Sequence, residues 1–158
     1  MAIEIERRFL VRKDIRRLCR DGIRIVQGYL PSDGEHTVRV RLAGSVGTLT
    51  MKSRRRGLCR DELEYTLPEH YAARLLRTAC GNGLIEKTRY LVHHHGHCWE
   101  VDVFGGENAG LVIAEIELSH PEQVVPLPDW VGAEVTHVSA YSNSSLSRSP
   151  IRRWLAAA

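Results

Sequence analysis

The chain opens with Glu4-Ile5-Glu6-Arg7-Arg8, in which two carboxylates flank one apolar residue. In a β-strand, residues i and i+2 point to the same face of the sheet. Glu4 and Glu6 would therefore share one face and Ile5 would lie on the other. Similar alternation recurs in six segments that are far apart in the sequence: Arg39-Val40-Arg41, Lys52-Ser53-Arg54, Glu62-Leu63-Glu64, Lys87-Thr88-Arg89, Glu100-Val101-Asp102 and Glu115-Ile116-Glu117.

Most of these segments carry charges of a single sign. An antiparallel sheet with one face in water also alternates, but its surface charges are scattered in sign and type. If the segments instead curl into one closed sheet with the charges inside, the interior becomes a polar tunnel lined by carboxylates and cations. A tunnel of that kind suits a metal ion and a polyanion.

Length and composition set broad limits on the class of protein. A chain of 158 residues is sufficient for one domain, taken as residues 1–158, with a sizeable core. The net charge of +3 is too small to argue for a nucleic-acid partner. No run approaches the roughly 18 apolar residues of a membrane span, so no membrane association is expected. The charged N-terminal stretch does not resemble a signal peptide, so a cytoplasmic location is expected.

Periodicity and turn residues predict a mostly β (α+β) fold. Eight strands are expected at Ile3–Val11, Ile23–Leu30, Thr37–Ala43, Gly47–Lys52, Cys59–Thr66, Ile85–Val92, His97–Val103 and Gly110–Leu118. Helices are expected at about Lys13–Arg20, Pro68–Cys80, Asp129–Val135 and Asn143–Leu146. The predicted architecture is a closed eight-stranded antiparallel β-barrel with flanking helices, which cover its apolar outer face.

The acidic pairs indicate a metal site. Glu4 and Glu6 share one face of the first strand, and Glu115 and Glu117 share one face of the eighth. If these strands are neighbours, their carboxylates converge and repel one another unless a cation binds them. Mg²⁺ prefers a few carboxylates together with water and phosphate oxygens. The alternative is that these glutamates form structural salt bridges with arginines on opposite strands.

The basic residues indicate a phosphate site. Arginine binds phosphate through a bidentate fork, whereas lysine acts as a compact point charge. A chain of phosphates would meet several cations at once. The candidates are Arg8, Arg39, Arg41, Lys52, Arg54, Lys87 and Arg89. The alternative is cross-strand pairing on an exposed face, worth roughly 0.2–1 kcal/mol per pair.

The first segment resembles the E-x-E-x-K signature of the CYTH superfamily, the triphosphate tunnel metalloenzymes. Further segments follow in the order of that family: Gln27-Gly28-Tyr29-Leu30, Thr37-Val38-Arg39-Val40-Arg41, Leu49-Thr50-Met51-Lys52, Ile85-Glu86-Lys87-Thr88-Arg89-Tyr90, Trp99-Glu100-Val101-Asp102-Val103-Phe104, Ala114-Glu115-Ile116-Glu117-Leu118, Trp130-Val131-Gly132-Ala133-Glu134-Val135-Thr136 and Tyr141-Ser142-Asn143. The resemblance spans almost the whole chain and is closest to the small bacterial members.

The resemblance implies an eight-stranded antiparallel tunnel that binds triphosphate compounds and a divalent metal, usually Mg²⁺ or Mn²⁺. It assigns the metal to Glu4, Glu6 and Glu117, with Glu115 close by. It assigns the phosphates to a basic set made up of Arg8, Arg39, Arg41, Lys52, Lys87 and Arg89. Family members include inorganic triphosphatases, thiamine triphosphatases, class IV adenylyl cyclases and RNA triphosphatases, and a homodimer is plausible for the family.

Two departures from the family pattern matter. Arg8 stands where the signature has lysine, and an arginine can orient phosphate but cannot accept a proton. Lys52, a second metal, or a carboxylate could instead handle the proton of the attacking water; the candidate carboxylates are Glu62, Glu64 and Asp102. The stretch from Thr136 to Tyr141 also lacks the acidic and basic residues expected there.

The predicted activity is metal-dependent hydrolysis of inorganic triphosphate to pyrophosphate and phosphate, with Lys52, Arg8 and Glu117 as catalytic residues. The small chain shows no extra domain and no aromatic clamp for a base. ATP cyclisation ranks lower because nothing marks an adenine pocket. Thiamine triphosphate is a third candidate, since Trp130 or Tyr29 could stack on its rings. A non-catalytic polyphosphate-binding module needs only the same cations.

Overall fold

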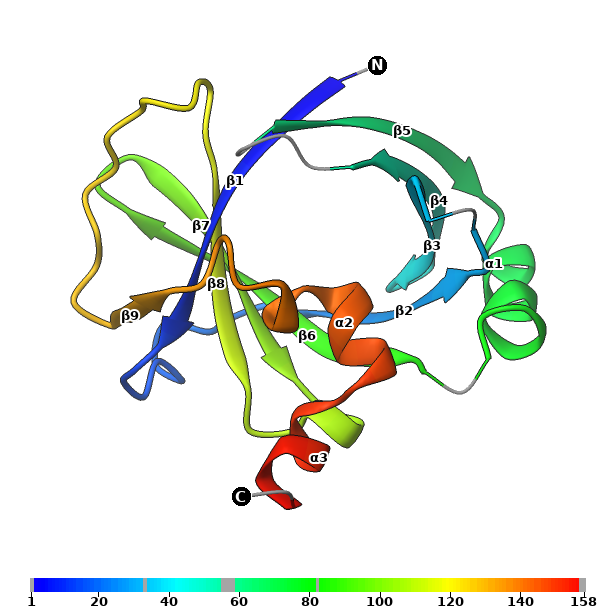
Figure 1. Cartoon of the computed structure of the whole chain (residues 1–158). Coiled ribbons are helices and arrows are strands. Elements are labelled where there is room, and N and C mark those ends of the chain that lie inside the picture. The colour runs from blue at the N-terminus through cyan, green and yellow to red at the C-terminus, as the bar shows by residue number, and fades with distance from the viewer. Residues whose placement is uncertain (1, 33, 55–58, 82, 157–158) are drawn as a thin grey trace.

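The computed structural model describes residues 2–32, 34–54, 59–81 and 83–156 (Figure 1). Nine strands form one antiparallel sheet. Their bounds are β1 Ala2–Val11, β2 Ile23–Leu30, β3 His36–Ala43, β4 Val46–Ser53, β5 Cys59–Leu67, β6 Ile85–His94, β7 His97–Phe104, β8 Val112–Glu117 and β9 Val131–Glu134. The mostly β, antiparallel prediction is confirmed, although the sheet has nine strands where eight were expected.

The strand order is β5-β4-β3-β2-β6-β7-β8-β1-β9, with an additional pairing of β5 with β1. β1 therefore has different partners along its length: Ala2–Ile5 pair with β5, and Glu6–Leu10 pair with β8. Figure 1 shows the sheet curling so that β1 passes beside β5. One face of the sheet is thereby turned inward on itself.

The ninth strand corrects the expected helix at Asp129–Val135. Val131–Glu134 extends the sheet beyond β1, where Phe9 lies opposite Glu134 and Val11 opposite Val131. A short apolar segment cannot be assigned to helix or strand by periodicity alone, and an available strand edge decides here.

The helix expected at Lys13–Arg20 is also wrong. The segment forms a single turn, in which the backbone N–H groups of Leu18 and Cys19 donate to the Ile15 carbonyl. The Asp14 carboxylate accepts from the Arg16 backbone N–H at 3.0 Å. Aspartate that binds nearby backbone in this way competes with helix formation.

One long helix covers the outer face of β3 and β4. α1, Glu69–Thr78, buries Ala72 and Leu76 against Val40 of β3. Gly47 of β4 lies directly beneath this helix, because a Cβ there would come within 2.6 Å of the Ala72 Cβ. Shorter elements follow further along the chain: η1 Gly106–Asn108, η2 Ser139–Tyr141, α2 Asn143–Arg148 and α3 Ile151–Ala156.

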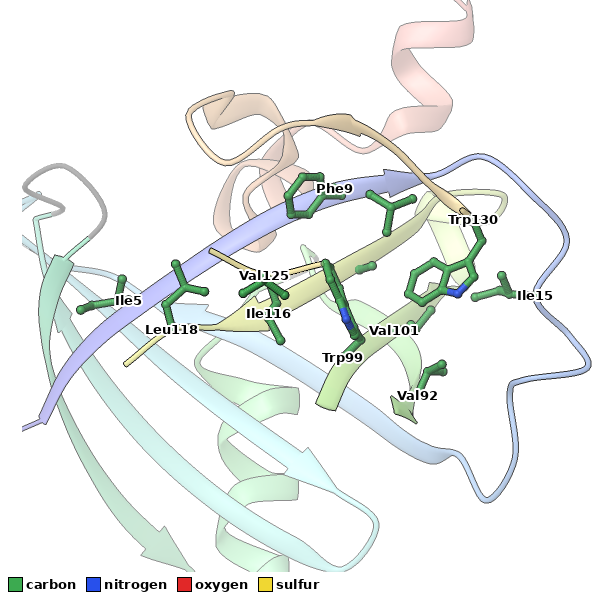
Figure 2. Close-up of a cluster of buried hydrophobic side chains, with 12 residues drawn as sticks. Ile5, Phe9, Ile15, Val92, Trp99, Val101, Ile116, Leu118, Val125 and Trp130 are labelled. Atoms are coloured by element: carbon green, nitrogen blue, oxygen red, sulfur yellow. The ribbon is translucent and has the colours of Figure 1, made fainter. Parts of the chain in front are cut away.

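A second apolar cluster is centred on Trp99 of β7, which is fully buried. Its ring lies edge-on to Phe9 of β1 and to Trp130, with both centroid distances 5.7 Å (Figure 2). Val125 and Trp130, from the connection between β8 and β9, pack into the same cluster. The expectation that helices cover the whole outer face is thus wrong, because a loop covers this part.

Candidate active site

A cavity of about 250 Å³ is lined by side chains from each of the strands β1 to β8. Its lining residues are Glu6, Arg8, Tyr29, Thr37, Arg39, Arg41, Lys52, Glu62, Glu64, Arg89, Glu100, Glu115, Glu117, Ser142, Asn143 and Ser144. Apolar residues that alternate with the charged ones on β3, β7 and β8 are buried on the other side: Val40, Val101 and Ile116 are at most 3% exposed, whereas Leu63 of β5 is 40% exposed. Each of the seven charged segments contributes at least one charged side chain to this cavity, and both charged members line it in Arg39-Val40-Arg41, Glu62-Leu63-Glu64 and Glu115-Ile116-Glu117.

Two carboxylates face each other across the β1–β8 ladder. Glu6 and Glu117 are direct Cα partners and both line the cavity. Like charges placed directly opposite one another destabilise a sheet. The carboxylate of Glu117 has no hydrogen bond or ion pair with the side chains and backbone that the structure describes. These carboxylates are hard oxygen donors of the kind that Mg²⁺ and Mn²⁺ bind, so the donor set fits a divalent cation.

The other two predicted metal ligands, Glu4 and Glu115, are not placed by the structure as free carboxylates beside Glu6 and Glu117. The side chain of Glu4 lies outside the described residues. Glu115 is ion-paired to Arg89, with 3.0 Å between the Arg89 Nη2 and a carboxylate oxygen. Over the described part of the chain, no group of three or more acidic, histidine or cysteine side chains is arranged to hold a metal.

The arginines of β3 are the cavity cations that lack carboxylate partners. Neither Arg39 nor Arg41 has an ion pair among the residues that the structure describes. Arg39 is 9% exposed and donates to Thr50 Oγ1 at 3.1 Å, while its Nε is buried without a hydrogen-bond partner. Arg41 donates to Gln27 Oε1 at 3.3 Å. Burial, together with the charges of Arg39 and Arg89, lowers the pKa of Arg41 to about 10.

A buried cation without a counter-ion is costly. An anion bound in the cavity would supply the missing charge to both arginines of β3, which lie two residues apart on one strand. The structure therefore brings together two of the predicted phosphate-binding residues, and neither is ion-paired to a described carboxylate. Both guanidinium groups are available to bind an anion.

Arg89 of β6, by contrast, is saturated by protein carboxylates. It donates to Asp102 at 2.7 Å, to Glu115 at 3.0 Å and also to Glu100. Burial alone would lower the pKa of Arg89, but its contacts with these carboxylates, Asp102 above all, raise it. Substrate would have to share this guanidinium with existing partners.

Lys87 and Asp102 form an ion pair behind the cavity wall and do not line it. Their side chains are 0% and 1% exposed. Burial lowers the pKa of Lys87. Burial would raise the pKa of Asp102, but the charges of Lys87 and Arg89 outweigh it and lower that pKa. The structure places neither residue where it touches the cavity, although both were predicted site residues.

Of the remaining predicted residues, Lys52 and both β5 carboxylates line the cavity. The Lys52 Nζ lies 2.7 Å from Glu62, and the Glu64 carboxylate accepts from Thr50 Oγ1 at 3.1 Å. Arg54 lies outside the cavity lining, where its exposed guanidinium is 3.7 Å from Glu35.

The model of the CYTH domain family matches residues 2–149. The chain belongs to the CYTH family. It is 42% identical to an inorganic triphosphatase of Acetivibrio thermocellus, over 98% of this chain and 99% of that protein. It is 34% identical to an inorganic triphosphatase of Nitrosomonas europaea, over 92% of this chain and 97% of that one.

Solved structures support the same placement. The crystal structure of the inorganic triphosphatase NE1496 matches this CYTH chain with a TM-score of 0.69 at 30% identity, covering 94% of this chain and 97% of that one. A putative adenylate cyclase from Bacillus halodurans matches with a TM-score of 0.57 at 18% identity, covering 77% and 84%. At that identity the second likeness shows the fold alone.

Several lining residues of this CYTH protein were missed as site candidates. Glu100 belongs to a recognised charged pair, and Thr37 lies two residues before Arg39, so alternation could have identified both. The polar residues Ser142, Asn143 and Ser144 come from beyond the sheet, and no local pattern places them at the cavity. Ser142 caps the helix that follows, since its Oγ accepts from the Ser145 N–H at 3.2 Å.

Within the described residues, no helix combines the length and apolarity of a membrane span.

Proposed function

We propose that this CYTH protein is a cytoplasmic inorganic triphosphatase that hydrolyses triphosphate to pyrophosphate and phosphate with Mg²⁺ or Mn²⁺. One observation carries the proposal: a single cavity holds facing carboxylates, Glu6 and Glu117, and also two arginines, Arg39 and Arg41, that form no ion pair with the described residues. Cation-binding and anion-binding groups in one enclosure match a metal–polyphosphate complex. The curated relatives, both named inorganic triphosphatases, support this substrate.

In the proposed site the β1–β5 and β1–β8 pairings close β1 to β8 into a tunnel. Arg39 and Arg41 bind the phosphate chain from β3, and Lys52 adds a donor from β4. Glu6 and Glu117, with Glu4 and Glu115 as the further predicted ligands, hold the cation on the opposite wall. When bound, the divalent cation neutralises charge that develops on the phosphate oxygens.

Positioning and electrostatics carry most of phosphoryl transfer. Several fixed cations spread around one cavity would hold the phosphate chain in line with an attacking water. Lys52 forms an ion pair with Glu62. In the proposed site its ammonium group therefore serves as a hydrogen-bond donor to substrate. Glu117, whose carboxylate lacks a protein partner among the described residues, is the better candidate to orient water or metal.

The test is a substrate panel that measures released phosphate, pyrophosphate and cyclic AMP. Tripolyphosphate, ATP and thiamine triphosphate are each supplied with Mg²⁺, Mn²⁺ or EDTA. We expect tripolyphosphate to give the highest kcat/KM, with no turnover in EDTA. Glu4→Ala and Glu117→Ala should abolish turnover, whereas Glu122→Ala, at an exposed glutamate of the β8–β9 connection, should leave it unchanged.

Each other outcome identifies a different function. Cyclic AMP from ATP would favour a cyclase, and a preference for thiamine triphosphate would favour a thiamine triphosphatase. Tight binding of polyphosphate without phosphate release with any metal would indicate a binding module. Full activity of both glutamate variants, or turnover in EDTA, would reject the proposed mechanism.

A further inference from the structure

Arg8 contacts the chain segment that follows β9 more extensively than it contacts any carboxylate. Its Nη1 donates to the Tyr141 carbonyl at 3.1 Å, and its Nη2 donates to the Thr136 carbonyl at 3.0 Å. Its Nε lies 4.0 Å from Glu6, too far for a hydrogen bond. The guanidinium therefore directs two of its donors to main chain far away in sequence.

The backbone of Arg8 is bound to the same segment. The Arg8 N–H donates to Thr136 Oγ1 at 3.0 Å, and the Arg8 carbonyl accepts from the Val135 N–H at 2.8 Å. Arg8 and Thr136 are 6% and 2% exposed, so these contacts are shielded from water. Hydrogen bonds in such a setting are costly to leave unmade.

The segment held in this way supplies one wall of the cavity. Tyr141 is followed directly by Ser142, Asn143 and Ser144, which all line it. Ser142 also caps α2, and Leu146 of that helix is fully buried. The contact from Arg8 to the Tyr141 carbonyl thus lies next to the point where the chain enters the cavity wall.

We propose that Arg8 is a positioning residue. Its hydrogen bonds hold residues 136–141 against β1, an arrangement that we call the latch, and so place Ser142, Asn143 and Ser144 against the substrate. The planar fork of arginine reaches two carbonyls at once, whereas the single ammonium of lysine is a point donor. The arginine at this signature position is therefore not an equivalent stand-in for lysine. The effect on substrate rests on the proposed function, but the latch itself does not.

Arg8→Lys is the decisive variant, because it keeps the charge and restores the family signature. Hydrogen exchange is measured by mass spectrometry on the metal-free and substrate-free protein. We expect amides of residues 138–146 to exchange at least about tenfold faster than in the wild type, because opening that region becomes easier. Arg41→Lys is an equivalent change in the same cavity, at an arginine that donates to Gln27 and, among the described residues, forms no hydrogen bond with this segment. It should leave that exchange unchanged.

Kinetics on tripolyphosphate provide a readout that distinguishes positioning from direct chemistry. For Arg8→Lys we expect KM to rise at least about fivefold with a smaller change in kcat. Displacing Ser142, Asn143 and Ser144 should weaken substrate binding more than it slows the chemical step. Unchanged exchange together with equal or higher activity would show that Arg8 acts as the signature lysine does, and would overturn the latch. Faster exchange in Arg8→Lys, combined with a wild-type protein that is inactive on every triphosphate, would support the latch and reject only the function.

The wild-type protein offers a second measurement if Arg8→Lys does not fold. A latched segment predicts that the N–H groups of Val138, Tyr141 and Ser142, which are all hydrogen-bonded, are protected to a degree comparable with β9. Exchange as fast as that of the exposed residues 119–122 would overturn the proposal without any variant.

Discussion

Glu6 of β1 and Glu117 of β8 lie directly opposite each other in the antiparallel ladder, with both carboxylates on the cavity. A protein that keeps two like charges in register on one face accepts a cost in stability, because such pairs are unfavourable. That cost disappears when a cation lies between them. The relationship thus links the register of two strands to the metal dependence of the proposed reaction.

Glu117→Gln should separate stability from activity. Removing one of the two facing charges should leave the metal-free protein as stable as the wild type or more stable by up to about 1 kcal/mol. Activity on tripolyphosphate should fall by about 100-fold or more, since metal-based charge stabilisation is worth several kcal/mol. Thermal unfolding with and without Mg²⁺ should show that the metal-induced rise in Tm is lost, and Glu122→Gln should retain it. A variant that keeps the full rise would exclude Glu117 as a ligand.

Arg41→Gln should weaken substrate binding without unfolding the protein. The guanidinium is half-buried and has no ion pair among the described residues, so its removal should not destabilise the empty protein. Tripolyphosphate affinity, measured by calorimetry in EDTA to prevent turnover, should fall about 10- to 100-fold for the loss of one charge-assisted contact. Arg24→Gln, at an exposed arginine paired with Glu86, serves as the control. Equal affinity in the two variants would contradict an anion site on β3.

Asp102→Asn should be strongly destabilising, by about 3–5 kcal/mol, because it leaves the buried Lys87 without its counter-ion. Urea unfolding measures this loss. The matched change Glu86→Gln, on the exposed pair with Arg24, should cost less than about 0.5 kcal/mol. Similar midpoints for the two variants would mean that the buried pair contributes no more than a surface pair.

The pH dependence of stability should report the same carboxylate. The pKa of Asp102 is lowered in the folded state, so the unfolded chain binds its proton at higher pH than the native protein does. Its stabilising contribution is therefore complete above the ordinary aspartate range and is lost as the pH falls from about 5 towards 2. Urea midpoints over that range should fall less steeply for Asp102→Asn than for the wild type, and parallel curves would argue against the assignment.

Gly47→Ala should loosen the contact between α1 and β4. The new methyl group would lie 2.6 Å from the Ala72 Cβ and 2.7 Å from the Leu67 carbonyl oxygen, so backbone must move. Overpacking of this kind costs about 1–3 kcal/mol, measurable by chemical denaturation. Gly105→Ala is the control, because the nearest atom to its Cβ would be 3.8 Å away. A tolerated Gly47→Ala would show that α1 can shift without cost.

The charge alternation in the sequence predicted the sheet and most of the charged side chains on its inner face. Segments such as Arg39-Val40-Arg41 predicted both the strand and which side chains face the interior, because side-chain direction in a strand follows from chain geometry alone. Helical periodicity, by contrast, failed at Asp129–Val135, where the segment pairs with the edge of β1 as β9. It also failed at Lys13–Arg20, where side-chain bonds to nearby backbone hold a single turn.

In the candidate site, too, some features follow from the local sequence and others only from the tertiary structure. Local sequence was enough to place Glu6, Glu117, Arg39 and Arg41 on one face, since each belongs to a strand with a two-residue period. Which cations remain available was decided only by the tertiary structure. Arg89 and Lys87 carry the same charge as Arg41, yet strand pairing sets carboxylates of β7 beside them, and Arg8 is drawn to the carbonyls of a segment more than 120 residues away. Charge and periodicity are properties of the chain, whereas the identity of each partner depends on which strands and loops become neighbours when the sheet curls.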